Sequence, residues 1–199
     1  MSESIISVMI GYLQLQKKSV YKKRYVSGGN VEYRKLEASD WEQYKELRLL
    51  SLVQSPESFE NSFEDESKLS DEQWIGRVTA TQSAFIMGAY DGDVLIGVAG
   101  FAQGLKEKIK HKSYLWGLFV KKEYRGKHIA NDMLSKLVHI AFQNTDILQI
   151  QLTVASENDA AISLYKKLGF HKYGTEVDAL RINGKSYDEI LMANVTTET

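Results

Sequence analysis

The sequence predicts a mixed α/β domain, and two patterns carry that prediction. Residues 84–90 and 94–102 are apolar runs that flank Asp91-Gly92-Asp93, a strong hairpin turn signal. Further on, a strand at 114–120, an amphipathic helix from Ile129 and a strand at 147–154 follow one another. Because strand–helix–strand crossovers are right-handed, the strands at 114–120 and 147–154 should be parallel neighbours. We therefore expect a twisted sheet that is antiparallel at first and parallel around the turn after Val120.

The remaining elements follow from start and stop signals. Ser39-Asp40 predicts a helix start, and Trp41, Tyr44 and Leu47 recur at helical spacing before Pro56. The other expected elements are a strand at 31–36, a polar loop with short helical pieces at 55–70, a helix from Ser70 through Val78, a helix that begins at Asn158 and ends at Gly169, and strands at 170–178 and 186–192 joined across Asn183-Gly184-Lys185. Helices should therefore flank the sheet.

A length of 199 residues suits one domain, which we place at 31–199, preceded by an N-terminal extension at 1–30. Residues 5–15 are mostly apolar, but they are too few to span a bilayer and no basic residue precedes them. Five basic residues and Ser27-Gly28-Gly29 follow. The extension could be mobile, could pack on a second copy in a homodimer, or could lie upstream of the true start.

Charge and composition narrow the class of function. The 25 Lys and Arg residues nearly balance the 26 Asp and Glu residues, for a net charge of -1, so neither nucleic acid nor a membrane is an expected partner. The absence of cysteine excludes disulfides, thiolate metal sites and a cysteine nucleophile, and it fits a cytoplasmic location. The four histidines lack ligand spacing, so we expect no metal.

The segment from Phe119 to Leu134 predicts an anion site. An apolar strand ends at Val120, a basic turn carries Arg125 and Gly126, and an amphipathic helix begins at once. Backbone N–H groups in the first helical turn have no intrahelical acceptor, and the helix dipole favours negative charge in front of them. We therefore expect a phosphate-bearing ligand at this turn.

Two motifs here resemble those of the GNAT superfamily of N-acyltransferases, and the resemblance covers residues 31–195. Arg125-Gly126-Lys127-His128-Ile129-Ala130 is similar to the acyl-CoA signature Arg/Gln-x-x-Gly-x-Gly/Ala, with His128 in place of the central glycine. That imidazole either turns outward or loosens the phosphate site, and when protonated it could add a positive charge. The segment from Asn158 to Phe170 resembles the second hallmark, Asn-x-x-Ala-x-x-Leu-Tyr-x-x-x-Gly-Phe, completely.

The resemblance implies the GNAT fold, with its parallel central pair of strands split at a cofactor cleft, and acetyl-CoA as co-substrate. It implies that the pantetheine arm pairs with the strand at Leu118, Phe119 and Val120, and that an N–H near Val120 faces the thioester carbonyl. It also makes Tyr165 the general acid for the departing thiolate. The implied cofactor-binding residues are Leu118, Phe119, Val120, Arg125, Gly126, Lys127, His128, Ile129, Ala130, Asn131, Asn158 and Tyr165.

The general base and the acceptor stay open. Many family members carry a Glu on the strand before the cofactor turn, where this chain has Trp116 and Gly117. Glu176, Asp178, Asp188 and His111 are alternatives that could act through water, or they are simply solvated surface groups. The acidic stretch at 57–66 could attract a cationic amine or be a solvated loop, and the three tryptophans could line a pocket or fill the core.

Two functions from different classes fit these residues. The first is an N-acetyltransferase that moves an acetyl group from acetyl-CoA to a primary amine of a small molecule, peptide or protein, by direct attack in a ternary complex. The second is a coenzyme A binding or sensing module with little transfer activity, suggested by His128 and by the missing strand Glu. A nucleotide phosphatase of the P-loop class is not expected, because the chain has no complete Gly-x-x-x-x-Gly-Lys-Ser/Thr loop.

Overall fold

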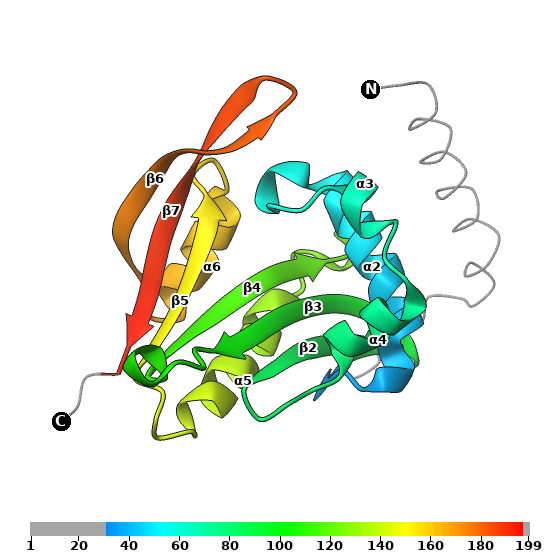
Figure 1. Ribbon diagram of the computed structural model, residues 1–199, viewed down its shortest axis with the longest axis horizontal. Coiled ribbons are helices and arrows are strands. Elements are labelled where there is room, and N and C mark those ends of the chain that lie inside the picture. The colour runs from blue at the N-terminus through cyan, green and yellow to red at the C-terminus, as the bar shows by residue number, and fades with distance from the viewer. Residues whose placement is uncertain (1–30, 197–199) are drawn as a thin grey trace. The chain divides into compact units, whose positions relative to one another are not determined.

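The computed structural model describes residues 31–196, which form one seven-stranded sheet with the order β1-β2-β3-β4-β5-β7-β6 (Figure 1). The expectation for residues 1–30 lies outside the described residues. The strands are β1 (Glu32–Lys35), β2 (Ala84–Asp91), β3 (Val94–Gln103), β4 (Lys112–Val120), β5 (Gln149–Ala155), β6 (His171–Ile182) and β7 (Lys185–Val195). The helices are α2 (Trp41–Gln54), α3 (Phe63–Glu66), α4 (Asp71–Val78), α5 (Ile129–Phe142) and α6 (Asp159–Lys167), with 3-10 turns η1 (Ala38–Asp40), η2 (Pro56–Ser58), η3 (Glu107–Ile109) and η4 (Lys122–Tyr124).

The first four strands are antiparallel, as predicted. β1 pairs with β2, β2 with β3, and β3 with β4. The β2–β3 hairpin turns through Gly92 at a φ of +59°, a conformation that glycine adopts without a steric penalty.

The parallel contact between β4 and β5 is short, and this shapes the site. Only Lys112, Ser113 and Tyr114 of β4 pair with β5. Beyond them β5 stays paired with β7 through Ala155, while β4 stays paired with β3 through Val120. Figure 1 shows the two strands diverging from this short contact. The predicted split in the sheet is therefore present.

Helices cover both faces of the sheet, and the burial follows the apolar stripes. Met133, Leu134 and Leu137 of α5 are fully buried in one cluster with Met87 and Ala89 of β2. Against the other face, the fully buried side chains include Leu47 of α2 and Trp74 of α4. Because successive strand residues point to opposite faces, the buried central strands β2 and β3 contribute to both cores.

Three details differ from the sequence expectation. The turn between the strand and α5 is longer than the short turn expected, because η4 and five further residues separate Val120 from Ile129. The buried residues of α6 are Ile162 and Tyr165, whereas the expected stripe at Ala161, Leu164 and Leu168 is only partly buried. The strand β6 runs to Ile182 rather than 178, since two register shifts let it follow β7 further than its apolar pattern suggests.

Candidate active site

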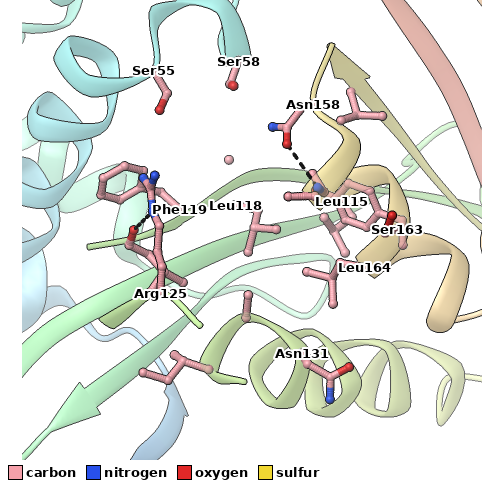
Figure 2. A pocket seen from close by; sticks show the side chains of 18 of the residues that line it. Ser55, Ser58, Leu115, Leu118, Phe119, Arg125, Asn131, Asn158, Ser163 and Leu164 are labelled. Carbon is pink, nitrogen blue, oxygen red and sulfur yellow. Dashed lines mark hydrogen bonds between the residues drawn. The ribbon is translucent and has the colours of Figure 1, made fainter. Parts of the chain in front are cut away.

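A cavity of about 470 Å³ lies in the split between β4 and β5 (Figure 2). Of the residues implied as cofactor-binding, eleven line it: Leu118, Phe119, Val120, Arg125, Gly126, His128, Ile129, Ala130, Asn131, Asn158 and Tyr165. Lys127 does not, and its ammonium lies 5.2 Å from the centre of the Tyr124 ring. Ser55, the C-cap of α2, and Ser58 of η2 also line the cavity. The volume is within the range of small-molecule sites.

A bulge in β4 shapes the wall of this cavity. The register places Val98 of β3 opposite Phe119 and Gly100 opposite Trp116, so β4 carries one extra residue here. Gly117 lies in that extra stretch at a φ of +65°. The Trp116 indole lies so close to Gly100 that a Cβ there would come within 2.2 Å of the ring. Trp116 is 41% exposed and lines the cavity, so it is a pocket residue, whereas Trp74 is a core residue.

Hydrogen bonding along β4 orients its last residue toward the split. The Lys121 N–H donates to the Ile96 carbonyl of β3 at 2.9 Å. Because antiparallel strands alternate in direction of hydrogen bonding, the N–H and C=O of Val120 face away from β3. The Val120 carbonyl accepts a bond from Arg125 Nε at 3.0 Å, and the Arg125 guanidinium lies 5.5 Å from the centre of the Phe119 ring. Arg125 thus bonds the last carbonyl of β4 and places its positive charge beside the cavity.

The turn before α5 presents free backbone donors. The first bond of this helix runs from the Asp132 N–H to the His128 carbonyl at 3.0 Å, so the N–H groups of Ile129, Ala130 and Asn131 have no intrahelical acceptor. Gly126 and His128 adopt positive φ values of 76° and 62°. His128 is exposed, so its imidazole is not packed into the core. The geometry is that of an anion site at a helix N-terminus.

The helix α6 supplies the opposite wall. Asn158 caps it, because Asn158 Oδ1 accepts a bond from the Ala161 N–H at 3.1 Å, as predicted. Tyr165 is 5% exposed and packs edge-on against Phe170, with ring centres 5.9 Å apart. Burial raises the pKa of the Tyr165 phenol above its usual value of 10.0. The hydroxyl is therefore protonated at neutral pH and can serve as a proton donor.

A second cavity of about 460 Å³ adjoins the first. The two share lining residues from η2, β4 and β5: Ser58, Phe59, Leu115, Trp116, Gly117 and Thr153. The second cavity is otherwise lined by polar groups, which are Arg48, Glu60, Asn61, Glu66, Arg77 and Glu189. Trp116 and the β4 bulge therefore lie where the two cavities meet, and the second cavity contains the carboxylates Glu60, Glu66 and Glu189.

Glu66 lines the second cavity and is bonded to several side chains around it. It is 2% exposed and accepts bonds from Arg48 Nε at 3.0 Å, from Arg48 at a second nitrogen at 2.9 Å, and from Asn61 at 2.7 Å. Arg77 of α4 forms an ion pair with it at 3.0 Å. Burial opposes ionisation of Glu66, but the bonds from Arg48 and its neighbours outweigh burial and lower its pKa. This network ties α2, α3 and α4 together.

Glu189 of β7 was not among the sequence candidates. It is 7% exposed and lines the second cavity, whereas Glu176, Asp178, Asp188 and His111 line neither cavity. Asp178 is instead bonded to Arg181 and Ser186 within the β6–β7 hairpin. The sequence signal that could have identified Glu189 is the two-residue alternation of β7, in which Glu189 shares a strand face with Tyr187 and Leu191.

Residues 31–196 contain no group of three or more His, Asp or Glu side chains that could hold a metal ion. In that range no helix combines the length and the apolar character needed to cross a bilayer.

The fold and the cavities define a class of α/β proteins that hold an anionic ligand at a helix N-terminus beside an opening in the sheet. Residues 41–170 match the acetyltransferase (GNAT) family, and the chain belongs to that family. The GNAT fold expected from the two motifs is therefore confirmed.

Curated relatives and solved structures agree with this assignment. The chain is 32% identical over 89 residues to the spermidine N(1)-acetyltransferase of Vibrio cholerae serotype O1, and 30% identical over 118 residues to the ribosomal protein uS5-alanine N-acetyltransferase of Escherichia coli K12. These matches cover 43% and 58% of this chain and 51% and 60% of those relatives. The chain thus spans little more than half the length of the curated relatives it matches.

Among solved structures, a GNAT-family acetyltransferase from Streptococcus pneumoniae superposes with a TM-score of 0.75 at 20% identity, covering 84% of this chain and all of that one. The yncA protein from Salmonella typhimurium, in a structure with its cofactor acetyl-CoA, superposes with a TM-score of 0.74 at 17% identity, covering 86% of this chain and 96% of that one. These likenesses establish the fold.

Proposed function

We propose that the protein transfers an acetyl group from acetyl-CoA to a primary amine, by direct attack in a ternary complex. The observation that carries this proposal is the cavity between β4 and β5, which joins an unpaired strand edge to the free N–H groups of α5. Membership of the GNAT family and the acetyltransferase names of the relatives support it.

The residues present fit acetyl-CoA. The edge of β4 beyond Tyr114 has no strand partner on its β5 side, so the pantetheine amides can pair with Leu118, Phe119 and Val120 as an added strand would. The N–H groups of Ile129, Ala130 and Asn131, with Arg125, would hold the diphosphate. Bound acetyl-CoA supplies an activated thioester, so no covalent enzyme intermediate is required.

The chain's own groups can stabilise the charges that develop. The Val120 N–H faces the split and can donate to the thioester oxygen as it becomes negative, and loss of one such fixed donor typically costs about 3–4 kcal/mol. The Tyr165 hydroxyl, held protonated by burial, can donate a proton to the departing thiolate.

The alternative is a coenzyme A binding module with little transfer activity. It is favoured by Trp116 and Gly117 on β4, where a family glutamate is expected, and by His128 in the left-handed region. Both functions require acetyl-CoA binding, but only the enzyme should also transfer the acetyl group to an amine.

Two measurements on the full chain separate them. Isothermal titration calorimetry reports acetyl-CoA binding, and a free-thiol assay reports transfer to spermidine, to a peptide with a free N-terminal alanine, and to an N-terminally blocked lysine peptide. The enzyme should release thiol with at least one amine. Binding without thiol release across a broad extension of this panel would favour the binding module.

Three further properties belong to the same proposal. We place the protein in the cytoplasm, in keeping with the absence of cysteine, and treat residues 31–199 as one domain. We also propose that the chain forms a homodimer, and light scattering coupled to size-exclusion chromatography would report its mass.

A further inference from the structure

The proposed transfer needs a group that takes a proton from the acceptor, because an amine is an ammonium ion at neutral pH and cannot attack until it is deprotonated. No glutamate of β4 is available, as Trp116 and Gly117 occupy the positions before Val120. We propose that Glu189 of β7 binds the acceptor ammonium group in the second cavity and accepts its proton. This inference rests on the proposed function.

The sheet topology places Glu189 one strand away from the split. In the β5–β7 register, Glu189 lies directly opposite Ala155, which lines the first cavity. Glu189 itself lines the second cavity, and Thr153 of β5 lines both. An amine held by Glu189 would therefore lie in the second cavity, which Leu115, Trp116, Gly117 and Thr153 connect to the first.

The cations of the second cavity do not neutralise Glu189. Arg48 and Arg77 are both paired with Glu66, at 2.9 and 3.0 Å. Among residues 31–196 no Lys, Arg or His forms an ion pair with Glu189, although it is 7% exposed. A nearly buried carboxylate without an ion-pair partner is costly, so its presence at a cavity wall indicates a cationic ligand.

Neighbouring carboxylates add to this negative charge. Glu176 of β6 lies directly opposite Glu189 in the β6–β7 register, and like charges in such a pair are destabilising. Glu60 lines the same cavity. Burial, then Glu60 and Glu176, raise the pKa of Glu189, while the Thr153 hydroxyl lowers it. A raised pKa makes the carboxylate a better proton acceptor, and an entering ammonium ion relieves the repulsion.

The ammonium N–H bond breaks and its proton moves to Glu189, which leaves a neutral amine and a carboxylic acid. The amine nitrogen then attacks the thioester carbon, the C–N bond forms and the C–S bond breaks. The thiolate takes the Tyr165 proton, the second amine proton restores Tyr165 through solvent, and Glu189 returns its proton to solvent. The products are an amide, the free thiol and one proton.

The test uses the Glu189→Gln variant of the full chain, in which the side chain keeps its shape but loses its charge. The substrate is the amine of the panel above that the wild-type protein acetylates fastest. We expect kcat/KM to fall about 10²–10⁴-fold. The acetyl-CoA Kd should stay within about twofold, because Glu189 does not line the first cavity. The wild-type kcat/KM should rise with pH through the pKa of Glu189, and the variant should lack that rise. An unchanged rate and pH profile would overturn the proposal.

Glu176→Gln is the matched control, since Glu176 lies opposite Glu189 but lines neither cavity. Removal of its charge should lower the Glu189 pKa, so the rising limb of the pH profile should move to lower pH. A ¹³C titration of labelled Glu carboxyls gives the same shift without activity, with the Glu189 signal identified by its loss in Glu189→Gln. A signal at the ordinary Glu pKa that Glu176→Gln leaves in place would contradict the proposal.

The two proposals can fail separately. If wild-type protein binds acetyl-CoA but releases no thiol with any amine, the transferase function fails and the role of Glu189 with it. If wild-type protein transfers acetyl groups and Glu189→Gln does so equally well, only the role of Glu189 is refuted.

Discussion

His128 occupies the left-handed region of backbone conformation, with a φ of 62°, at the N-cap of α5. The sequence motif has glycine at this position, and the structure gives the physical reason, because the turn needs a positive φ there. A residue with a Cβ pays about 1–2 kcal/mol for that conformation. The protein thus carries backbone strain at the edge of its anion site.

Substitution of His128 by Gly should relieve this strain. After subtraction of glycine's greater entropy in the unfolded chain, we expect a gain of about 0.5–1 kcal/mol in the free energy of unfolding, measured by urea denaturation. The acetyl-CoA affinity should be unchanged or improved. Asn183→Gly, at a φ of 51° in the β6–β7 turn, is the control and should gain less, because Asn tolerates this region. A large loss of affinity in His128→Gly would show that the imidazole binds phosphate.

Tyr165 can be tested in the same way. Tyr165→Phe keeps the ring that packs on Phe170 but removes the buried hydroxyl, so turnover should fall about 10²-fold while the acetyl-CoA Kd changes little. Stopped-flow or steady-state thiol release and calorimetry measure the two quantities. Tyr33→Phe, whose hydroxyl faces Asp132 at 3.5 Å outside the cavity, should keep full turnover. Equal activity in Tyr165→Phe would remove its role as proton donor.

At the scale of elements, the bulge in β4 does most to shape the site. Its extra residue pushes Trp116 against Gly100 and leaves the strand edge beyond Tyr114 free on the side of β5. Apolar alternation predicts the existence and order of such strands, as it did for the β2–β3 hairpin and for the parallel pair. It does not reveal a bulge, because an inserted residue changes the register only relative to a partner strand.

Gly100→Ala tests the importance of this packing. A Cβ at Gly100 would lie 2.2 Å from the Trp116 ring, so the indole must move, and we expect a loss of about 1–3 kcal/mol in the free energy of unfolding together with lower turnover. Gly76→Ala in α4 is the control, since nothing lies within 4 Å of its Cβ position. It should stabilise the protein by about 0.5–1 kcal/mol. A Gly100→Ala variant as stable and active as wild type would show that the bulge adapts.

At the scale of the whole molecule, contacts between segments far apart in the sequence determine which charged side chains lie close together. The motifs around Arg125 and Asn158 are local in sequence, so the anion side of the site was predictable from them. Glu189 was not, because its position depends on β7 lying between β5 and β6, an order that the sequence of strands along the chain does not reveal. The same holds for Glu66, whose partners Arg48 and Arg77 come from two other helices.

Two carboxylates of the folded protein, Asp40 and Glu189, have pKa shifts of opposite sign. The Arg34 guanidinium, bonded to Asp40 at 2.7 and 2.8 Å, lowers the pKa of that buried carboxyl from 3.8 to about 2. Asp40 therefore favours the folded state above pH 3.8, by roughly 2 kcal/mol, and this contribution is lost as the pH falls toward 2. Glu189 behaves oppositely, because its raised pKa means that its ionised form opposes folding.

Urea denaturation across pH should separate the two contributions. Asp40→Asn should be less stable than wild type at pH 6 by about 2 kcal/mol, and the difference should shrink as the pH falls through 2 and vanish below it, where wild-type Asp40 is protonated in both states. Glu189→Gln should be more stable than wild type at pH 7, with the difference vanishing below the unfolded pKa of 4.5, because the carboxyl is then neutral whether folded or not. A Glu189→Gln variant that is less stable at pH 7 would mean that the carboxylate is favourably bonded in the folded protein. It would then be a structural group and not one kept at a cost for the reaction.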